Sequence, residues 1–383
     1  METIGVIGVG KLGLCMTLAL EGAGYNMVCY EKNEGLSNAI SAKSLETIEP
    51  SVSESLKASK NINMVSSLDS IYTLPTIFVV VATPSLPNGS YNHSAVDEVI
   101  EGLLALNESV PNYDPKLLVI SCTTMPTYCD SLQEKVSKYN YKVCYNPEFI
   151  AQGDILHGLK NPDMVLIGGS DEEACNKLVG IYKRFLENEA TFQVMKCTEA
   201  ELTKISLNCF LTTKIAFANM IGDIVIKAGG NQDIVLKAIG SDTRVGGKFL
   251  KWGHGFGGPC LPRDNRALCY FSESIAIKHT IGETTDHSNK KHLDYLFDFI
   301  KSKNTESKPV FFNSVVYKKN TYIIEESQKL ELAILCANSG LNVVIYDDQK
   351  VIDELRNKYE NKFTYVDNTY NILQYFDVNQ YIS

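Results

Sequence analysis

Several patterns that would define a class of protein are missing from this 383-residue chain. Its eleven cysteines form no CxxC pair and no Cys/His spacing suited to zinc, so neither a disulfide framework nor a structural metal is expected. No run of lysines and arginines is interleaved with aromatic residues, and the formal net charge of -9 disfavours nucleic acid as a partner. We therefore expect reduced thiols, no bound metal and no nucleic-acid partner.

Membrane-directing features are also missing from the sequence. The chain begins METIGVIGVG, with no basic stretch before an apolar one, and no uninterrupted apolar run approaches the length that spans a bilayer. These absences predict a soluble, cytoplasmic protein with no membrane partner. The length of 383 residues exceeds one ordinary core and favours two or three domains.

The N-terminal residues have the pattern of a dinucleotide-binding unit. A β-branched strand leads into Gly8, Gly10 and Gly13, and a helix-length segment follows at residues 14–25. The glycines permit a tight turn and a close approach of pyrophosphate to the helix N-terminus. A second strand ends at Glu31, whose carboxylate can accept hydrogen bonds from an adenine ribose and would repel a 2′-phosphate. The pattern predicts an NAD site, with a plain tight turn as the alternative.

Strand-like and helix-like segments alternate through the first half of the chain. Apolar strands are expected at residues 76–83, 116–123, 141–149 and 163–169, with helical segments such as 94–106 and 127–139 between them. Such alternation predicts a doubly wound parallel sheet whose ligands lie beyond the carboxyl ends of the strands. The residues at these ends are Thr83, Pro84, Thr123, Thr124, Asn146, Pro147 and Glu148. Each is equally suited to an ordinary turn or cap.

A long helix is predicted from Thr198 to Gly230, with Thr198 and Glu201 as a capping box and a glycine pair at its end. Its apolar character suggests burial between domains or against a second subunit. Lys204 and Asn208 are four residues apart and share one face, where they could polarise an oxygen or hold a water. A solvated polar stripe is the alternative.

The stretch GFGGPCLPRD, residues 255–264, places a cysteine between a glycine-rich loop and a predicted helix start. Pro262 suits a first helical turn, whose unpaired N–H groups would favour the thiolate of Cys260. Asp264 would lie in the same turn. A buried, inert cysteine in a helix-entry loop is the alternative.

A second, smaller α/β unit is predicted near the C-terminus. A strand at 309–321, a helix at 325–340 and a strand at 341–348 repeat the βαβ pattern after a polar hinge at 301–309. Such a unit could close over the first, with a ligand between them. The expected domains are an NAD-binding domain at 1–197, a central helical domain with the cysteine loop at 198–305, and a C-terminal α/β domain at 306–383.

Together these segments resemble the nucleotide-sugar 6-dehydrogenases, the family of UDP-glucose and GDP-mannose dehydrogenases. The resembling stretches follow the family's order along nearly the whole chain and include GVIGVGKLG, YNPEFIAQGDILHGLKNPDMVLIGG, AELTKISLNCFLTTKIAF and DTRVGGKFLKWGHGFGGPCLPRD. The resemblance implies an NAD-binding Rossmann domain, a helical linker around which homodimers or higher homo-oligomers form, and a C-terminal domain that helps hold the nucleotide sugar. It also implies two successive NAD-dependent oxidations of a C6 alcohol to a carboxylate, with UDP-glucose as the expected substrate.

The resemblance assigns catalytic roles to six residues. Cys260 would form a thiohemiacetal and then a thioester with the sugar. Lys204 and Asn208 would stabilise oxyanions, and Asp264 would work with Lys204 on a catalytic water. The set of proton-handling residues would be completed by Thr124 and Glu148.

The resemblance also assigns binding residues. The expected cofactor contacts are Gly8, Val9, Gly10, Lys11, Leu12, Gly13, Glu31, Thr83, Pro84, Thr124 and Arg263. The expected substrate contacts are Glu148, Phe149, Gln152, Asn161, Lys204, Asn208, Arg244, Phe249, Lys251, Gly257, Cys260 and Lys318. Among these, Arg244 would reach the site of a neighbouring subunit.

Some positions depart from the family's pattern. Gln152 stands where many members have a second glutamate, Ser314 replaces a glycine, and Glu325 stands where members carry arginine. The chain also ends earlier than most relatives, so the C-terminal nucleotide clamp is the part in which the resemblance is weakest. GDP-mannose is the alternative substrate, while N-acetylated sugars are disfavoured because Pro259 precedes the cysteine where their enzymes carry histidine. A single-step hydroxyacid dehydrogenase, which would not need Cys260, is a more distant alternative among enzymes. A nucleotide-sugar-binding protein without turnover is the alternative from another class.

Overall fold

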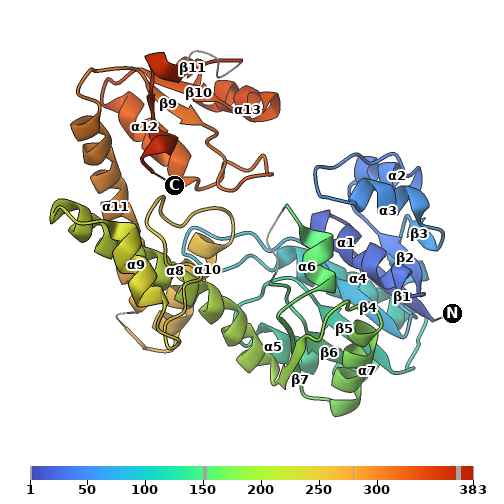
Figure 1. The fold of residues 1–383 in the computed structure, drawn as a ribbon. Coiled ribbons are helices and arrows are strands. Elements are labelled where there is room, and N and C mark those ends of the chain that lie inside the picture. Colours follow the sequence, from blue (N-terminus) through green and yellow to red (C-terminus); the bar gives the residue numbers. More distant parts are fainter. Residues whose placement is uncertain (1, 150–152, 279, 368–371, 383) are drawn as a thin grey trace. The chain divides into compact units, whose positions relative to one another are not determined.

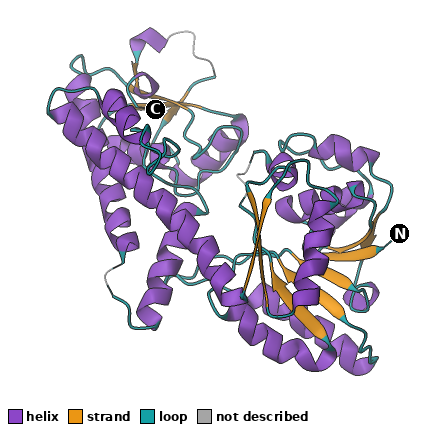
Figure 2. Cartoon of the chain, turned by 60° about the horizontal axis from the view of Figure 1, so that its bottom comes forward, coloured by secondary structure: helices purple, strands orange, loops and turns teal. Residues whose placement is uncertain are grey.

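A computed structural model of the chain describes residues 2–149, 153–278, 280–367 and 372–382. Internal contacts divide the chain into two compact units, Met1–Lys204 and Ile205–Ser383. The division falls within one long helix, α8 (Cys197–Lys227). Figure 1 shows the order of the elements, and Figure 2 shows that each unit has a sheet of its own. The three-domain division expected from the sequence stays a prediction.

The first unit is built on an eight-stranded sheet, ordered β3-β2-β1-β4-β5-β6-β7-β8. The strands are β1 (Thr3–Ile7), β2 (Asn26–Tyr30), β3 (Ile62–Val65), β4 (Thr76–Val79), β5 (Lys116–Ile120), β6 (Tyr141–Tyr145), β7 (Met164–Gly169) and β8 (Thr191–Met195). The helices are α1 (Lys11–Gly22), α2 (Glu34–Ser41), α3 (Val52–Ala58), α4 (Ser94–Ser109), α5 (Tyr128–Val136), α6 (Ile155–Lys160), α7 (Glu172–Lys183) and the start of α8. The order of the first six strands is that of dinucleotide-binding folds.

One strand departs from the predicted parallel arrangement. β7 runs antiparallel to β6, with Cys144 opposite Gly169, whereas the other neighbouring pairs of this sheet are parallel. The helix between them, α6, has six residues and spans only about 9 Å, less than half the length of a six-residue strand of about 20 Å. An antiparallel pair needs no crossover, so a helix this short is sufficient to connect the two strands.

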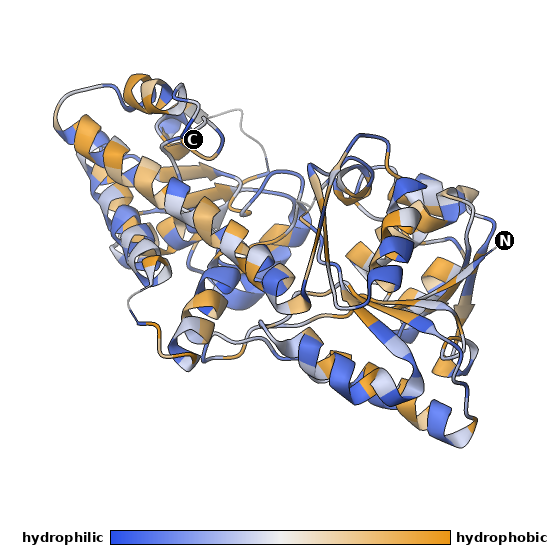
Figure 3. Ribbon diagram, turned by 90° about the horizontal axis from the view of Figure 1, so that it is seen from below, coloured by the Kyte–Doolittle hydropathy of each residue, from blue (hydrophilic) through white to orange (hydrophobic). Residues whose placement is uncertain are grey.

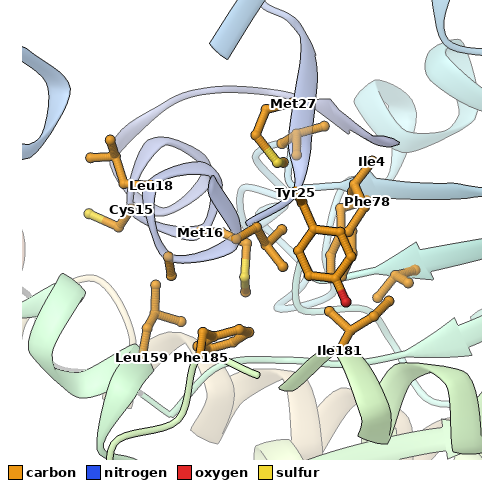
Figure 4. Packing of buried hydrophobic residues seen from close by; sticks show 14 of the residues in the cluster. Ile4, Cys15, Met16, Leu18, Tyr25, Met27, Phe78, Leu159, Ile181 and Phe185 are labelled. Atoms are coloured by element: carbon orange, nitrogen blue, oxygen red, sulfur yellow. The ribbon is translucent and has the colours of Figure 1, made fainter. Parts of the chain in front are cut away.

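Apolar layers cover both faces of the large sheet. On one face, α1, α6 and α7 pack Met16, Leu159 and Ile181 against strand residues such as Ile4 and Phe78 (Figure 4). The other face is covered by α4, α5 and the first turn of α8. Helices on both faces make the sheet doubly wound, so the predicted α/β class is confirmed.

The capping box predicted from Thr198 and Glu201 at the start of α8 is wrong. The Glu201 carboxylate instead accepts hydrogen bonds from the backbone N–H groups of Thr127 (2.7 Å) and Cys129 (2.9 Å) at the start of α5. In α8 itself, Glu199 accepts the backbone N–H three residues before it, at 2.9 Å. Both glutamates have a spacing that suits helix capping. The tertiary structure decides that Glu201 caps α5 while Glu199 caps α8.

The second unit joins long helices to a small parallel sheet, ordered β11-β10-β9-β12. The central part has α8, α9 (Gln232–Gly240), α10 (Leu261–Ser274) and α11 (Ile281–Lys303). The remainder has β9 (Val310–Asn313), α12 (Gln328–Asn338), β10 (Val343–Tyr346), α13 (Gln349–Tyr359), β11 (Thr364–Tyr365) and β12 (Phe376–Asp377). The predicted second βαβ unit is therefore confirmed as β9, α12 and β10, while α13 and the two-residue strands β11 and β12 carried too little sequence pattern to be predicted.

Helices and small sheet share one core in the second unit. Trp252, Leu296 and Phe312 belong to the same buried cluster, although they come from a loop, a helix and a strand. Polar and apolar residues mix along the helices, as the hydropathy colours of Figure 3 show. The α8 helix has low amphipathicity for its length, because apolar residues lie on several of its faces.

By length and composition alone, α8 could cross a membrane. Its most apolar 18-residue window has a mean hydropathy of 1.5, and 33% of that window is buried. The helix contains no uninterrupted apolar run of that length, because Lys214 interrupts it, so this finding does not contradict the expectation from the sequence. Length and composition do not distinguish a span from a helix that another protein surface covers.

We expect Gly222→Ala in α8 to destabilise the second unit. A Cβ at Gly222 would lie 2.1 Å from Cδ1 of Trp252, whose ring is buried and whose Nε1 donates to Asp223 at 2.8 Å. Overpacking should cost about 1–3 kcal/mol and outweigh the gain of about 1 kcal/mol in helix propensity. Urea unfolding followed by circular dichroism and by the fluorescence of Trp252, the single tryptophan, measures the change.

The matched control is Gly180→Ala in α7, where an added Cβ meets nothing within 4 Å. This variant should be as stable as the parent protein or more stable by about 0.5–1 kcal/mol. Equal effects of the two substitutions would contradict the packing argument.

Candidate active site

The glycine fingerprint forms the turn between β1 and α1. Gly8 has a φ of 89°, and a Cβ there would lie 2.6 Å from the carbonyl oxygen of Val80. A Cβ at Gly13 would lie 1.9 Å from the carbonyl oxygen of Gly8, so both glycines are required by the turn itself. Gly10 differs, because a Cβ there would meet nothing within 4 Å. Gly10 caps α1, whose first turn has no acidic residue, so the open space fits a pyrophosphate at the helix N-terminus.

Glu31 holds this turn from the end of β2. Its Oε2 accepts the backbone N–H of Val9 at 2.8 Å, and its Oε1 accepts that of Asn33 at 2.9 Å. The neighbouring Lys32, whose charge would favour a 2′-phosphate, is paired with Glu98 at 2.6 Å. The carboxylate is thus fixed where a ribose would bind, which suits NAD better than NADP.

The other expected cofactor contacts differ in their surroundings. Lys11 and Leu12 begin α1, directly after the glycine turn. Thr83 is buried and donates to the carbonyl oxygen of Thr123 at 2.7 Å, while Pro84 beside it is exposed. Arg263 belongs to the second unit, and its contact with the cofactor stays a prediction.

A polar cluster in the first unit surrounds Glu148, just beyond β6. The Lys204 ammonium donates to the backbone carbonyl of Glu148 at 2.6 Å and lies 4.5 Å from the centre of the Phe149 ring. The Tyr182 hydroxyl contacts the Glu148 carboxyl group. Glu148 keeps some exposed surface as a residue, but its carboxyl group is enclosed, and this burial raises its pKa to about 7 against the opposing effect of the Lys204 charge. A carboxyl group that titrates near neutral pH can act as a general acid or base.

Thr124 is fully buried beside this cluster. Its hydroxyl donates to the Glu201 carboxylate at 2.8 Å, and burial raises the pKa of Glu201. The sequence pattern did not reveal this contact, which orients the hydroxyl. The proton-handling role of Thr124 stays a prediction.

A second cluster lies in the second unit, at the start of α10. Cys260 is the N-cap residue, Pro262 lies in the first turn, and Asp264 follows, as the sequence predicted. Asp264 is 1% exposed, and its Oδ2 accepts from the Asn208 amide at 2.6 Å. Lys204 and Asn208 are both buried, so they do not form the solvated polar stripe that was the alternative. The predicted joint action of Asp264 and Lys204 on a water stays a prediction.

Cys260 differs from the other cysteines in its exposure. Nine of the eleven are buried, Cys269 is intermediate, and Cys260 is exposed. Burial raises the pKa of enclosed thiols, for example that of Cys15 to about 12, which keeps them protonated and unreactive. The alternative of a buried, inert cysteine at residue 260 is therefore wrong.

The glycines before Cys260 have a packing role that the sequence did not reveal. A Cβ at Gly257 would lie 2.2 Å from the carbonyl oxygen of Glu326, and a Cβ at Gly258 would lie 2.3 Å from the Tyr317 ring. The backbone N–H of Gly258 also donates to the Glu326 carbonyl at 3.4 Å. These glycines admit the C-terminal part of the second unit against the cysteine loop, and the expected contact of Gly257 with substrate stays a prediction.

The remaining expected substrate residues lie at or near the surface. Asn161 caps the C-terminus of α6 and donates to Glu187 at 3.3 Å. Arg244 is largely exposed and forms an ion pair with Asp242 at 2.7 Å. Their substrate contacts stay predictions.

Three further expected substrate residues belong to the second unit, and one lies outside the description. Phe249 is exposed with a φ of 61°, and Lys251 is exposed close by. The backbone oxygen of Lys318 accepts from Thr321 at 2.7 Å. Gln152 lies outside the described residues.

The fold and the glycine turn define an NAD-binding oxidoreductase of the dehydrogenase type. The sequence matches the NAD binding domain of the UDP-glucose/GDP-mannose dehydrogenase family over residues 2–186 and the family's central domain over residues 198–291. The chain belongs to this family and is an NAD-dependent nucleotide-sugar 6-dehydrogenase.

Individual proteins agree with this assignment. The UDP-glucose 6-dehydrogenase of Rickettsia felis is 29% identical over 94% of this chain and 82% of its own. The structure of a UDP-glucose dehydrogenase from Pyrobaculum islandicum aligns over 96% of this chain and 86% of its own, with a TM-score of 0.87 and 27% identity. A GDP-mannose dehydrogenase from Pseudomonas aeruginosa, 22% identical, shares the fold with a TM-score of 0.59 over 98% of this chain and 91% of its own.

We expect Glu31→Gln to weaken NAD binding by about tenfold or more, because hydrogen bonds to a charged carboxylate are worth about 1.5–3 kcal/mol. The preference for NAD over NADP should narrow as well, since the charge that repels a 2′-phosphate is removed. Isothermal titration calorimetry with both dinucleotides measures the two effects. Glu34→Gln, at an exposed glutamate on α2, is the matched control and should leave both affinities unchanged. Equal affinity of the parent protein for NAD and NADP would contradict the role of Glu31.

Proposed function

We propose that the chain oxidises UDP-glucose to UDP-glucuronate, with Cys260 as the covalent nucleophile. The observation that carries the proposal is the exposed thiol at the N-terminus of α10, one turn before an Asp264 that Asn208 holds. The partial positive charge of a helix N-terminus favours a thiolate at this position. The relatives from Rickettsia felis and Pyrobaculum islandicum are named UDP-glucose dehydrogenases, which supports UDP-glucose over GDP-mannose as the substrate.

The first oxidation converts the C6 alcohol to an aldehyde. Bound NAD supplies the hydride acceptor for each of the two oxidations. The Lys204 ammonium would stabilise the alkoxide that forms as the hydroxyl loses its proton. Glu148, with a pKa of about 7, would accept that proton.

The second oxidation depends on Cys260. An aldehyde is a poor hydride donor, so the thiolate first adds to its carbonyl carbon, and the oxygen takes a proton to give a thiohemiacetal. Loss of the second hydride from C6 and of the proton from the thiohemiacetal hydroxyl leaves a thioester. Water then attacks the carbonyl carbon, the C–S bond breaks, and the carboxylate leaves as Cys260 returns to the thiolate. Asp264 would orient this water, and the Asn208 amide would stabilise the oxyanion.

The remaining contacts are proposed from the family resemblance. Recognition of the nucleotide sugar would involve Phe149, Gln152, Asn161, Phe249, Lys251, Gly257 and Lys318. The exposure of Arg244 leaves its side chain accessible to a neighbouring subunit, as the resemblance implies.

We further propose that a second copy of the chain covers α8 and that the enzyme works in the cytoplasm. Phe210, Phe217 and Ile224 are exposed and follow one another at seven-residue spacing, so they form a stripe along one face of the helix. Phe210 alone is 65% exposed. Apolar patches of this kind commonly mark a protein interface, and the family resemblance favours a homodimer.

The first test is the number of NADH molecules formed per UDP-glucose consumed. We expect two, because an alcohol loses two hydrides on the way to a carboxylate. Cys260→Ser should stop after the first hydride or lose turnover, whereas Cys269→Ser should behave as the parent protein. GDP-mannose measured alongside should give no more than a small fraction of this rate. One NADH per sugar, or full activity of Cys260→Ser, would exclude the thioester route.

The second test concerns the proposed dimer. Phe210→Glu should convert a dimer, about twice the chain mass of 42.5 kDa, to a monomer at micromolar concentration, because a charge cannot be buried in an apolar interface without a partner. Sedimentation velocity measures the mass. Val110→Glu, at an exposed apolar residue of the first unit, is the control and should stay dimeric. A monomeric parent protein, or one recovered with membranes, would contradict the proposal.

A further inference from the structure

A chain of hydrogen bonds extends behind the carboxyl group of Glu148, within the first unit. The Asn146 amide group donates to the backbone carbonyl of Leu166 at 2.9 Å, which fixes the orientation of the amide. Its Oδ1 therefore faces the Tyr182 hydroxyl, 2.6 Å away. The same hydroxyl contacts Oε1 of Glu148. Asn146 and Tyr182 are buried, so protein atoms and not bulk water must satisfy these groups.

The Tyr182 hydroxyl has only one proton to share between its two hydrogen-bond partners. A tyrosine hydroxyl donates one hydrogen bond, and an amide oxygen can only accept. The Tyr182 proton therefore lies on the bond to Asn146, and the bond between Tyr182 and Glu148 needs a proton from the carboxyl group. With Glu148 ionised, one of the two contacts would join two acceptors with no proton between them, which is unfavourable at such short range.

Two further influences act on the Glu148 carboxyl group. Its burial favours the neutral acid and raises its pKa to about 7. The Lys204 ammonium, which donates to the backbone carbonyl of Glu148, is the charged group that opposes this effect by favouring the carboxylate. A Tyr182 hydroxyl that donated to the carboxylate would lower this pKa instead. Because the Tyr182 proton lies on the bond to Asn146, the hydroxyl offers the acid an acceptor that the carboxylate cannot use, and the hydrogen-bond chain acts in the same direction as burial.

We propose that Tyr182 is a positioning residue that holds the proton on Glu148 and so raises the pH above which this carboxylate can accept a proton from the reacting sugar or from water. The catalytic part of this statement rests on the proposed function. The protonation of Glu148 itself does not, and it can be measured without turnover.

Removing the Tyr182 hydroxyl distinguishes the two directions of this hydrogen bond. If Glu148 donates to Tyr182, Tyr182→Phe removes an acceptor from the acid and nothing from the carboxylate, so the pKa of Glu148 falls. If Tyr182 donates to the carboxylate, the same substitution removes a donor from the charged form, and the pKa rises. One hydrogen bond corresponds to about half a pH unit to one pH unit. Tyr182→Phe also removes the donor to Asn146. This loss destabilises the protein equally whether Glu148 is protonated or ionised, so it does not change the direction of the pKa shift.

The first experiment measures stability against pH. A carboxyl group whose pKa is higher in the folded chain stabilises the fold below its unfolded pKa of about 4.3, and this contribution is lost as pH rises through the folded value near 7. The urea midpoint of the parent protein, relative to that of Glu148→Gln, should therefore decrease as the pH rises from the unfolded to the folded pKa. The same comparison is then made between Tyr182→Phe and the double variant Tyr182→Phe/Glu148→Gln. In this pair, the stabilisation by Glu148 should be lost at a pH about half a unit to one unit lower than in the first pair. A fall that ends at the same or a higher pH would overturn the proposal.

The second experiment measures kcat for UDP-glucose against pH. Turnover that needs the Glu148 carboxylate rises with pH, and in Tyr182→Phe this rise should move to lower pH by the same amount, with KM nearly unchanged. Tyr139→Phe is the matched control, because it removes a hydroxyl that contacts a different carboxylate, that of Glu108, and should leave the profile in place. A shift to higher pH, or none, would overturn the role of Tyr182.

Two further outcomes remain interpretable. If no sugar is turned over, the proposed function fails while the stability experiment still decides the state of Glu148. If Tyr182→Phe does not fold, Asn146→Ala provides a second test. It frees the Tyr182 proton for the carboxylate, so the pKa of Glu148 should again fall, and an unchanged value would overturn the proposal.

Discussion

The buried carboxylate of Glu201 is the contact on which the first unit's part of the site depends. It ties α8 to the N-terminus of α5 by accepting two backbone N–H groups there, and it also accepts the Thr124 hydroxyl. Negative charge is favoured at a helix N-terminus, which offsets part of the cost of burying it. With α8 held in this way, Lys204 lies almost one turn further on and reaches the backbone of Glu148. Without Glu201, the backbone N–H of the buried Cys129 would lose the acceptor that it has in this structure.

The α8 helix, 31 residues long, carries both buried polar and exposed apolar side chains. Lys204 and Asn208 lie one turn apart, so a single helix carries polar side chains of both compact units. Other faces of the same helix are apolar and exposed, with Phe210 as the largest example. This combination explains why α8 resembles a membrane span in composition, although buried polar residues interrupt its early turns.

The loop before Cys260 depends on the C-terminal part of the second unit. Glycines at 257 and 258 admit the Glu326 carbonyl and the Tyr317 ring, and the Glu326 carboxylate pairs with Arg266 in the helix that Cys260 begins. Tyr317 and Glu326 belong to the segment that follows β9, and this segment starts at Ser314. Ser314 has a φ of 74°, which glycine would adopt with less strain. The departures at Ser314 and Glu325 therefore lie within three residues of Tyr317 and Glu326, which pack against the cysteine loop.

The sequence by itself determined the fold class, the NAD site and the position of Cys260 at the start of a helix, because each depends on short patterns that constrain the backbone locally. Glycine spacing defines the β1–α1 turn, and Pro262 marks a helix start. Only the tertiary structure decided the direction of β7 and the partners of Glu201 and Tyr182. Glu201 bonds to residues more than seventy positions away, and Tyr182 to residues more than thirty positions away. No local pattern encodes such contacts, because they arise when burial forces distant polar groups to satisfy one another.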